Sequence, residues 1–85
     1  MFITSRVLVA LKNTKIDDGR QSEARLLLSA IKHLRLIGEG SMVQHFFFPY
    51  GHALFVGDVA GQNYYILLGK KNGVEYVAQI TTEMP

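Results

Sequence analysis

Residues 40–69 contain one formally charged side chain, that of Asp58. They also hold seven of the nine aromatic residues of the chain. Such a stretch must be buried over most of its length, because exposed apolar surface costs ~25 cal/mol per Å2. The window therefore decides which folds are open to a chain of 85 residues.

The length of the chain predicts a single domain, spanning residues 1–85. A domain of this size buries only roughly 60–65% of the surface that its unfolded chain exposes, so its stability margin is thin. The chain has no cysteine, and its three histidines lack the spacing of zinc ligands. We expect no disulfide, metal or other cofactor, so stability must come from apolar packing or from association.

The N-terminal segment lacks the features of a targeting signal. No basic region precedes the apolar run at 7–11, and that run is too short for a signal core. No apolar stretch approaches the ~20 residues that a membrane helix needs. A chain without cysteine also suits a reducing compartment. These features predict a cytoplasmic protein that does not associate with a membrane.

The first part of the chain predicts one strand and one helix. Residues 2–11 are rich in β-branched and alternating apolar side chains, which predicts a strand. A short helix beginning at Thr4 or Ser5 is the alternative. Residues 20–37 carry apolar side chains at helical spacing, which predicts an amphipathic helix. Asp18 is its expected cap, and Gly38 is the glycine expected to end it.

From Met42 onward the apolar side chains repeat with a period of two, which predicts strands. The expected strands are 42–48, 53–60, 64–69 and 74–82, and the expected turns are 49–51, 61–63 and 70–73. Asn72-Gly73 is the strongest hairpin signal, because both residues tolerate a positive φ. Gly57, inside a predicted strand, indicates a bulge or a close approach of another backbone.

The predicted fold class is α+β, with the element order β-α-β-β-β-β. An antiparallel sheet of four to five strands carries the single helix on one face. Three of the strands are apolar on both sides, and only 74–82 alternates like a sheet with one wet face. One helix leaves an apolar face uncovered, larger than a monomer usually exposes. This predicts a face-to-face or edge-to-edge homodimer. A partial barrel and a surface for a different protein are the alternatives.

Four candidate catalytic residues surround one predicted turn: His45, Tyr50, His52 and Asp58. A histidine pair beside a tyrosine and an aspartate suits the acid–base chemistry of small ribonucleases. No spacing motif or nucleophile supports that chemistry here, and a histidine satisfied at the margin of a sheet is the preferred interpretation. We therefore predict no catalytic residue.

The charge of the chain is too mild to identify a nucleic-acid-binding protein. Its net charge is +2, with a pI of about 9.1. Contacts to a nucleic acid or to an acidic partner would come from Lys12, Lys15, Lys70 and Lys71. Single-strand platforms combine aromatic and basic side chains, whereas residues 40–69 contain no lysine or arginine. RNA or DNA binding is therefore the second hypothesis.

The predicted function is non-enzymatic protein binding, with the chain forming a homodimer. The expected interface residues are Phe47, Tyr50, Tyr64 and Tyr65, because aromatic side chains are enriched at binding hot spots. Small domains without cysteine or motifs are common among inhibitors made by phages and mobile elements, such as anti-CRISPR proteins. That analogy of size suggests an inhibitor or antagonist. A small ribonuclease is the third hypothesis.

Overall fold

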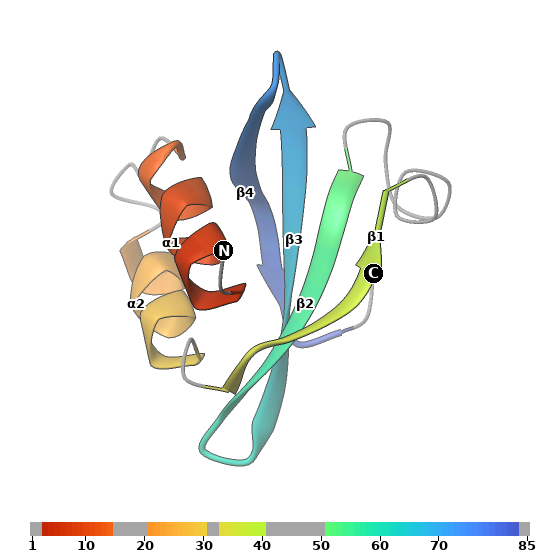
Figure 1. The fold of residues 1–85 in the computed structure, drawn as a ribbon. Coiled ribbons are helices and arrows are strands. Elements are labelled where there is room, and N and C mark those ends of the chain that lie inside the picture. Colours follow the sequence, from red (N-terminus) through yellow and green to blue (C-terminus); the bar gives the residue numbers. More distant parts are fainter. Residues whose placement is uncertain (1–2, 15–20, 31–32, 41–50, 84–85) are drawn as a thin grey trace.

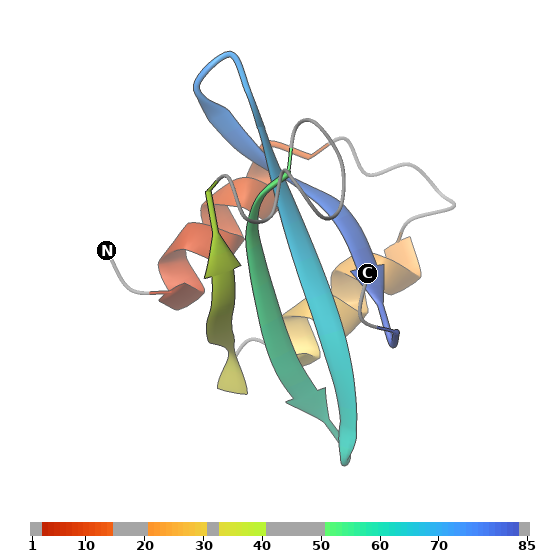
Figure 2. The same ribbon diagram turned by 90° about the vertical axis from the view of Figure 1, so that its right-hand side faces the viewer.

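The computed structural model describes residues 3–14, 21–30, 33–40 and 51–83. Two helices come first, and four strands follow: α1 (Ile3–Lys12), α2 (Gln21–Ala30), β1 (Arg35–Glu39), β2 (Gly51–Val59), β3 (Gln62–Lys71) and β4 (Val74–Thr81). The strands form one antiparallel sheet in the order β1-β2-β3-β4. Both helices lie on the same side of it (Figures 1 and 2). The predicted α+β class is confirmed, with two helices instead of one.

The strand predicted at 2–11 is wrong, because this segment is the helix α1. Val7 and Ala10 are completely buried and Leu11 packs against the same core, which is the spacing of one helical face. Val9, which a strand would place on the same side as Val7, is 46% exposed. A short apolar run fits both periods, and the helical alternative is the correct one.

The helix predicted at 20–37 is too long. α2 ends at Ala30, and residues 35–39 form β1, which pairs with β2. Gly38 does not end a helix; it is buried in β1 opposite Leu54. Pairing with another strand has overridden the local helical pattern of apolar residues. Leu27 and Ala30 do face the core as the pattern predicts, and the expected cap Asp18 lies outside the described residues.

The last three strands match the predicted ones to within a few residues, whereas the strand expected at 42–48 and the turn at 49–51 lie outside the described residues. Two-residue turns with positive φ connect them: Ala60-Gly61 (52° and 84°) and Asn72-Gly73 (54° and 78°). Two positive φ angles define the turn that suits the twist of a hairpin. The hairpin predicted at Asn72-Gly73 is therefore confirmed.

The main core lies between the helices and the near face of the sheet. Its completely or almost completely buried members are Val7, Ala10, Leu27, Ala30, Ala53, Phe55, Ile66, Leu68 and Val77. α2 comes so close to β2 that a Cβ added at Gly57 would stand 2.9 Å from the Cβ of Ala30. The close approach predicted at Gly57 is thus confirmed, and the helix packs directly on the strand backbone.

The opposite face of the sheet, which we call the far face, carries a second apolar cluster. Leu54 and Leu67 are its buried members, each 2% exposed, and Tyr65 and Ala78 pack against them. β2 and β3 are thus apolar on both sides, as the sequence predicts. These side chains are nevertheless buried within a single chain. They do not form the large exposed apolar face from which the sequence predicts a homodimer. The four described strands form an open sheet, not a barrel.

The two edges of the sheet differ in what lies beside them. At the β4 edge, the side-chain amide of Asn13 donates to the carbonyl of Glu75 (3.2 Å), and the Thr14 hydroxyl accepts from the backbone N–H of Val77 (2.8 Å). Side chains just after α1 thereby occupy backbone groups that a further strand would need. At the β1 edge, Leu36 and Ile37 are adjacent and each 37% exposed.

Candidate functional site

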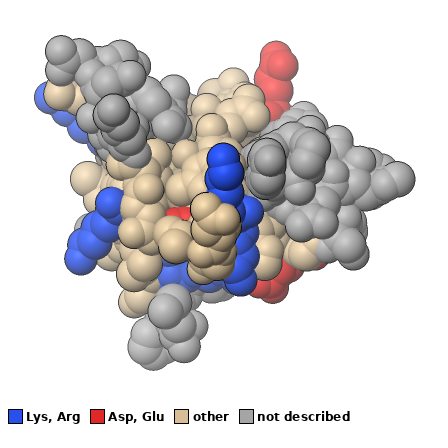
Figure 3. Space-filling view, turned by 90° about the horizontal axis from the view of Figure 1, so that it is seen from above, with Lys and Arg blue, Asp and Glu red and all other residues tan. Residues whose placement is uncertain are grey.

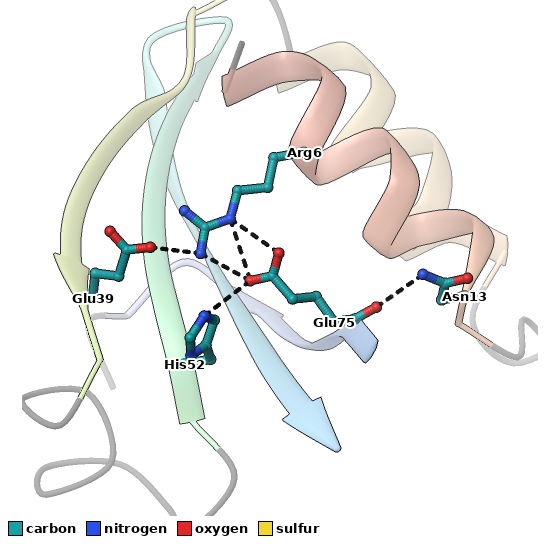
Figure 4. Close-up of polar contacts among 5 residues, drawn as sticks. All are labelled: Arg6, Asn13, Glu39, His52 and Glu75. Atoms are coloured by element: carbon teal, nitrogen blue, oxygen red, sulfur yellow. Dashed lines mark hydrogen bonds and ion pairs between the residues drawn. The ribbon is translucent and has the colours of Figure 1, made fainter. Parts of the chain in front are cut away.

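A charged cluster joins α1 to three strands (Figure 4). Arg6 of α1 donates through Nε to both carboxylate oxygens of Glu75 on β4 (3.1 and 3.2 Å) and through Nη2 to Oε2 (2.9 Å). The same Nη2 lies 2.8 Å from the carboxylate of Glu39 on β1. His52 of β2 places Nε2 3.5 Å from the Glu75 carboxylate. The cluster therefore brings together residues from four separate elements.

Burial and charge shift the pKa of Glu75 in opposite directions. Burial raises the pKa of the Glu75 carboxyl, but the hydrogen bonds and positive charge of Arg6, aided by His52 and Lys70, outweigh it, so the pKa lies below its ordinary value. The hydrogen bond to Glu75 raises the pKa of the Arg6 guanidinium despite partial burial. The guanidinium also lies 5.7 Å from the centre of the Phe55 ring, which favours a cation. Arg6 and Glu75 are both ionised at neutral pH.

The lowered pKa of Glu75 predicts a loss of stability in acid. Its contribution is fully present above the ordinary carboxyl pKa of 4.5, and it disappears as the pH falls through the lower pKa of the folded state. Urea unfolding between pH 6 and pH 3 should show that wild type loses more stability than Glu75→Gln. Glu83→Gln, which removes an exposed carboxylate, is the control and should follow wild type. Parallel acid profiles for wild type and Glu75→Gln would contradict this assignment.

The geometry of the cluster suits a structural role better than catalysis. Both carboxylates face Arg6, and the one histidine in the cluster contacts Glu75. His45, its expected partner, lies outside the described residues. No set of three or more histidines, cysteines or acidic residues in the described segments is arranged to hold a metal ion. None of the described helices is long and apolar enough to cross a membrane.

A small polar hollow lies beside the turn that joins β2 to β3. Its volume is about 190 Å3, and it is lined by His33, Arg35, Val56, Gly57, Asp58 and Asn63. Ligand pockets usually measure about 300–1,000 Å3. One oxygen of Asp58 accepts the N–H of Gly61 (2.8 Å), so this side chain stabilises a turn. The hollow is too small and too exposed to identify a substrate.

The structure separates the aromatic residues predicted to form an interface. Phe47 and Tyr50 lie outside the described residues. Tyr64 and Tyr65 are half-buried neighbours on β3, whose side chains point to opposite faces of the sheet. Tyr65 packs against the far-face cluster of Leu54 and Leu67. The pair therefore does not form one continuous aromatic surface.

Four lysines are predicted to contact a nucleic acid or an acidic partner, and three of them lie at one end of the molecule. Lys70 and Lys71 are exposed at the β3–β4 hairpin. Lys70 lies opposite Glu75 in the register of the two strands. The chain just after exposed Lys12 is hydrogen-bonded to Glu75 and Val77. Lys15 lies outside the described residues. We call Lys12, Lys70 and Lys71 the basic end.

Sequence reasoning missed three features of these surfaces. The apolar spacing predicts a helix at Leu36 and Ile37, whereas these residues lie on an edge strand. The ion pair between Arg6 and Glu75 joins residues 69 positions apart, and no local sequence pattern predicts it. The ring of Tyr76 lies over Gly69, and only the pairing of β3 with β4 brings these two residues together. The Asn-Gly turn fixes that register and is the one signal from which the last contact follows.

Comparisons of this chain with known protein families, with curated proteins and with solved structures found no match.

Proposed function

We propose that the protein is a non-enzymatic protein-binding module that associates through the outer edge of β1. The observation that carries this proposal is the exposure of two adjacent large apolar residues, Leu36 and Ile37, on a strand with one described neighbour. An edge strand presents unpaired N–H and C=O groups in a row, and another strand can pair with them. Exposed apolar side chains beside these groups add affinity.

The contrast with the other edge supports this choice. Asn13 and Thr14 occupy backbone groups of β4 at Glu75 and Val77. The described residues contain no comparable side-chain contact to the outer edge of β1. A bulge between Leu36 and Gly38 also places Ile37 outside the regular pairing with β2. Its side chain is therefore available to a partner strand.

The simplest partner is a second copy of the chain. Two β1 strands related by a twofold axis would pair antiparallel and join two sheets into one. β1 has only five residues, so the interface is small and the dimer is expected to be weak. Pairing with a strand of another protein would use the same groups and would block that protein's own sheet edge, as an inhibitor of the phage or mobile-element kind would. Phe47 and Tyr50 remain predicted contributors.

Ile37→Lys tests the proposal, because a charge on an edge strand opposes pairing. We expect light scattering at about 300 µM, where even a weak interface is occupied, to give a dimer mass for wild type and the mass of one chain for the variant. Leu28→Lys is the matched control, since Leu28 is 50% exposed on α2 and lies away from β1. A single-chain mass for wild type, or equal effects of both variants, would overturn self-association through β1.

A further inference from the structure

A tyrosine and two lysines lie on the β3–β4 hairpin, and the end of α1 that carries a third lysine, Lys12, lies beside β4. Gly69 pairs with Tyr76 across this hairpin, and Lys71 pairs with Val74. Because alternate residues of a strand share a face, Lys71, Val74 and Tyr76 lie on the far face. Lys70 and Glu75 lie on the near face, beside the end of α1.

Tyr76 lies across the backbone of Gly69. A Cβ at position 69 would stand 2.6 Å from both Cζ and Oη of Tyr76, so the phenol end of the ring fills the space of the missing side chain. Tyr76 is half-buried, with one side supported by the strand. A ring held in this way presents its remaining surface at little cost in conformational entropy.

Exposed positive charge lies on both faces of the hairpin that carries this ring. Lys12, Lys70 and Lys71 are all exposed, and Glu75, the acidic side chain nearest to Lys70 in the sheet register, is engaged by Arg6. The hairpin projects at one end of the molecule (Figure 1). Seen from that end, Lys and Arg side chains lie in the middle and on the left of the face, with a small patch of acidic surface between them (Figure 3). Lys71 lies on the same face as Tyr76, whereas Lys70 lies on the other face of the hairpin, so a bound chain would contact both by passing over the hairpin tip.

We propose that the basic end and Tyr76 form a binding site for single-stranded nucleic acid. The ring of Tyr76 would stack with one base, and the lysines would contact the phosphates on either side of it. Stacking of bases on aromatic side chains combined with lysine contacts to phosphates is the usual chemistry of single-strand recognition. The aromatic window at 40–69 lacks lysine and arginine, but Tyr76 lies outside that window and on the same hairpin as Lys70 and Lys71. The site is separate from β1 and does not depend on self-association.

Fluorescence anisotropy with labelled ten-residue oligo-dT and oligo-U tests this proposal. We expect Tyr76→Ala to weaken binding about 10- to 30-fold, and Tyr76→Phe, which keeps the ring, to stay within about 3-fold of wild type. Gly69→Ala should weaken binding similarly, because the new methyl group displaces the ring. Contact with three phosphates predicts that raising salt from 50 to 200 mM weakens binding about 20-fold. Lys70→Gln should reduce that salt dependence by about a third.

Arg25→Gln is the matched control, because it removes one exposed positive charge from α2, away from the hairpin. It should leave the affinity unchanged. Amide NMR of wild type gives a test without any variant: addition of oligo-dT should shift signals of residues 69–76. The proposal is overturned if neither oligonucleotide binds at 50 mM salt. It is equally overturned if Tyr76→Ala and Gly69→Ala, both still folded by circular dichroism, bind as wild type does, since the lysines would then attract any polyanion.

Discussion

Gly57→Ala is expected to destabilise the protein by about 2–3 kcal/mol, although it adds a single methyl group. That methyl would stand 2.9 Å from the Cβ and 3.1 Å from the backbone oxygen of Ala30, and 3.0 Å from a methyl of Leu34. Ala30 is completely buried and has no side-chain freedom with which to make room. α2 must therefore move away from β2, which opens the core. In a domain of this size the melting temperature should fall by roughly 10–20 °C.

Gly69→Ala is the matched control, because its added methyl meets an even closer neighbour in the same sheet, at 2.6 Å. There the nearest atoms are Cζ and Oη of Tyr76, at the far end of a side chain that can rotate away. Alanine also fits a strand better than glycine does. We expect its free energy of unfolding to stay within about 1 kcal/mol of wild type. Equal losses for the two variants would contradict direct packing of α2 on the backbone of β2.

A second variant locates the strain in Gly57→Ala. Ala30→Gly removes the Cβ that lies 2.9 Å away but leaves the backbone oxygen at 3.1 Å. The double variant should therefore recover only part of the loss, with a coupling energy of about 1 kcal/mol between the two positions. Urea unfolding of the four proteins measures this coupling. Purely additive effects would show that the contact with the Cβ of Ala30 does not carry the strain.

The C-terminal half of the fold follows from the sequence because its signals are local. Asn72-Gly73 supplies the two positive φ angles of its own turn. The two-residue length of that turn then sets which residues of β3 and β4 face each other. Gly57 is informative in the same way, since a glycine among large apolar strand residues has to be explained by something close to it.

The N-terminal half could not be assigned in this way. The apolar run in α1 fits both a strand, which the sequence favours, and a helix. Its helical form depends on burying Val7 and Ala10 against a sheet that forms far along the chain. Residues 35–39 continue the apolar spacing of α2, yet they pair with β2. Contacts between distant segments decide both cases. The candidate surfaces are as hard to predict, because an edge strand becomes visible only once the strand order is known.

Arg6→Met should destabilise the protein by about 2 kcal/mol at pH 7. Methionine keeps much of the apolar stem of the side chain but removes the guanidinium near Phe55 and every hydrogen bond to Glu75. A largely buried carboxylate, 21% exposed, then remains with His52 at 3.5 Å as its nearest described partner. A charge without a partner in such a place costs more than the pair itself contributes.

Two further variants separate that cost from ordinary loss of a surface ion pair. Glu39→Gln breaks the contact of Arg6 with a carboxylate that is 48% exposed, and it should cost less than about 1 kcal/mol. Adding Glu75→Leu to Arg6→Met removes the unpaired carboxylate and should recover at least about half of the loss. The effect of Arg6→Met should also shrink at pH 3, because protonated Glu75 carries no charge to leave unpaired. A loss that persists unchanged at pH 3 and in the double variant would mean that Arg6 stabilises the fold through packing on Phe55 and not through Glu75.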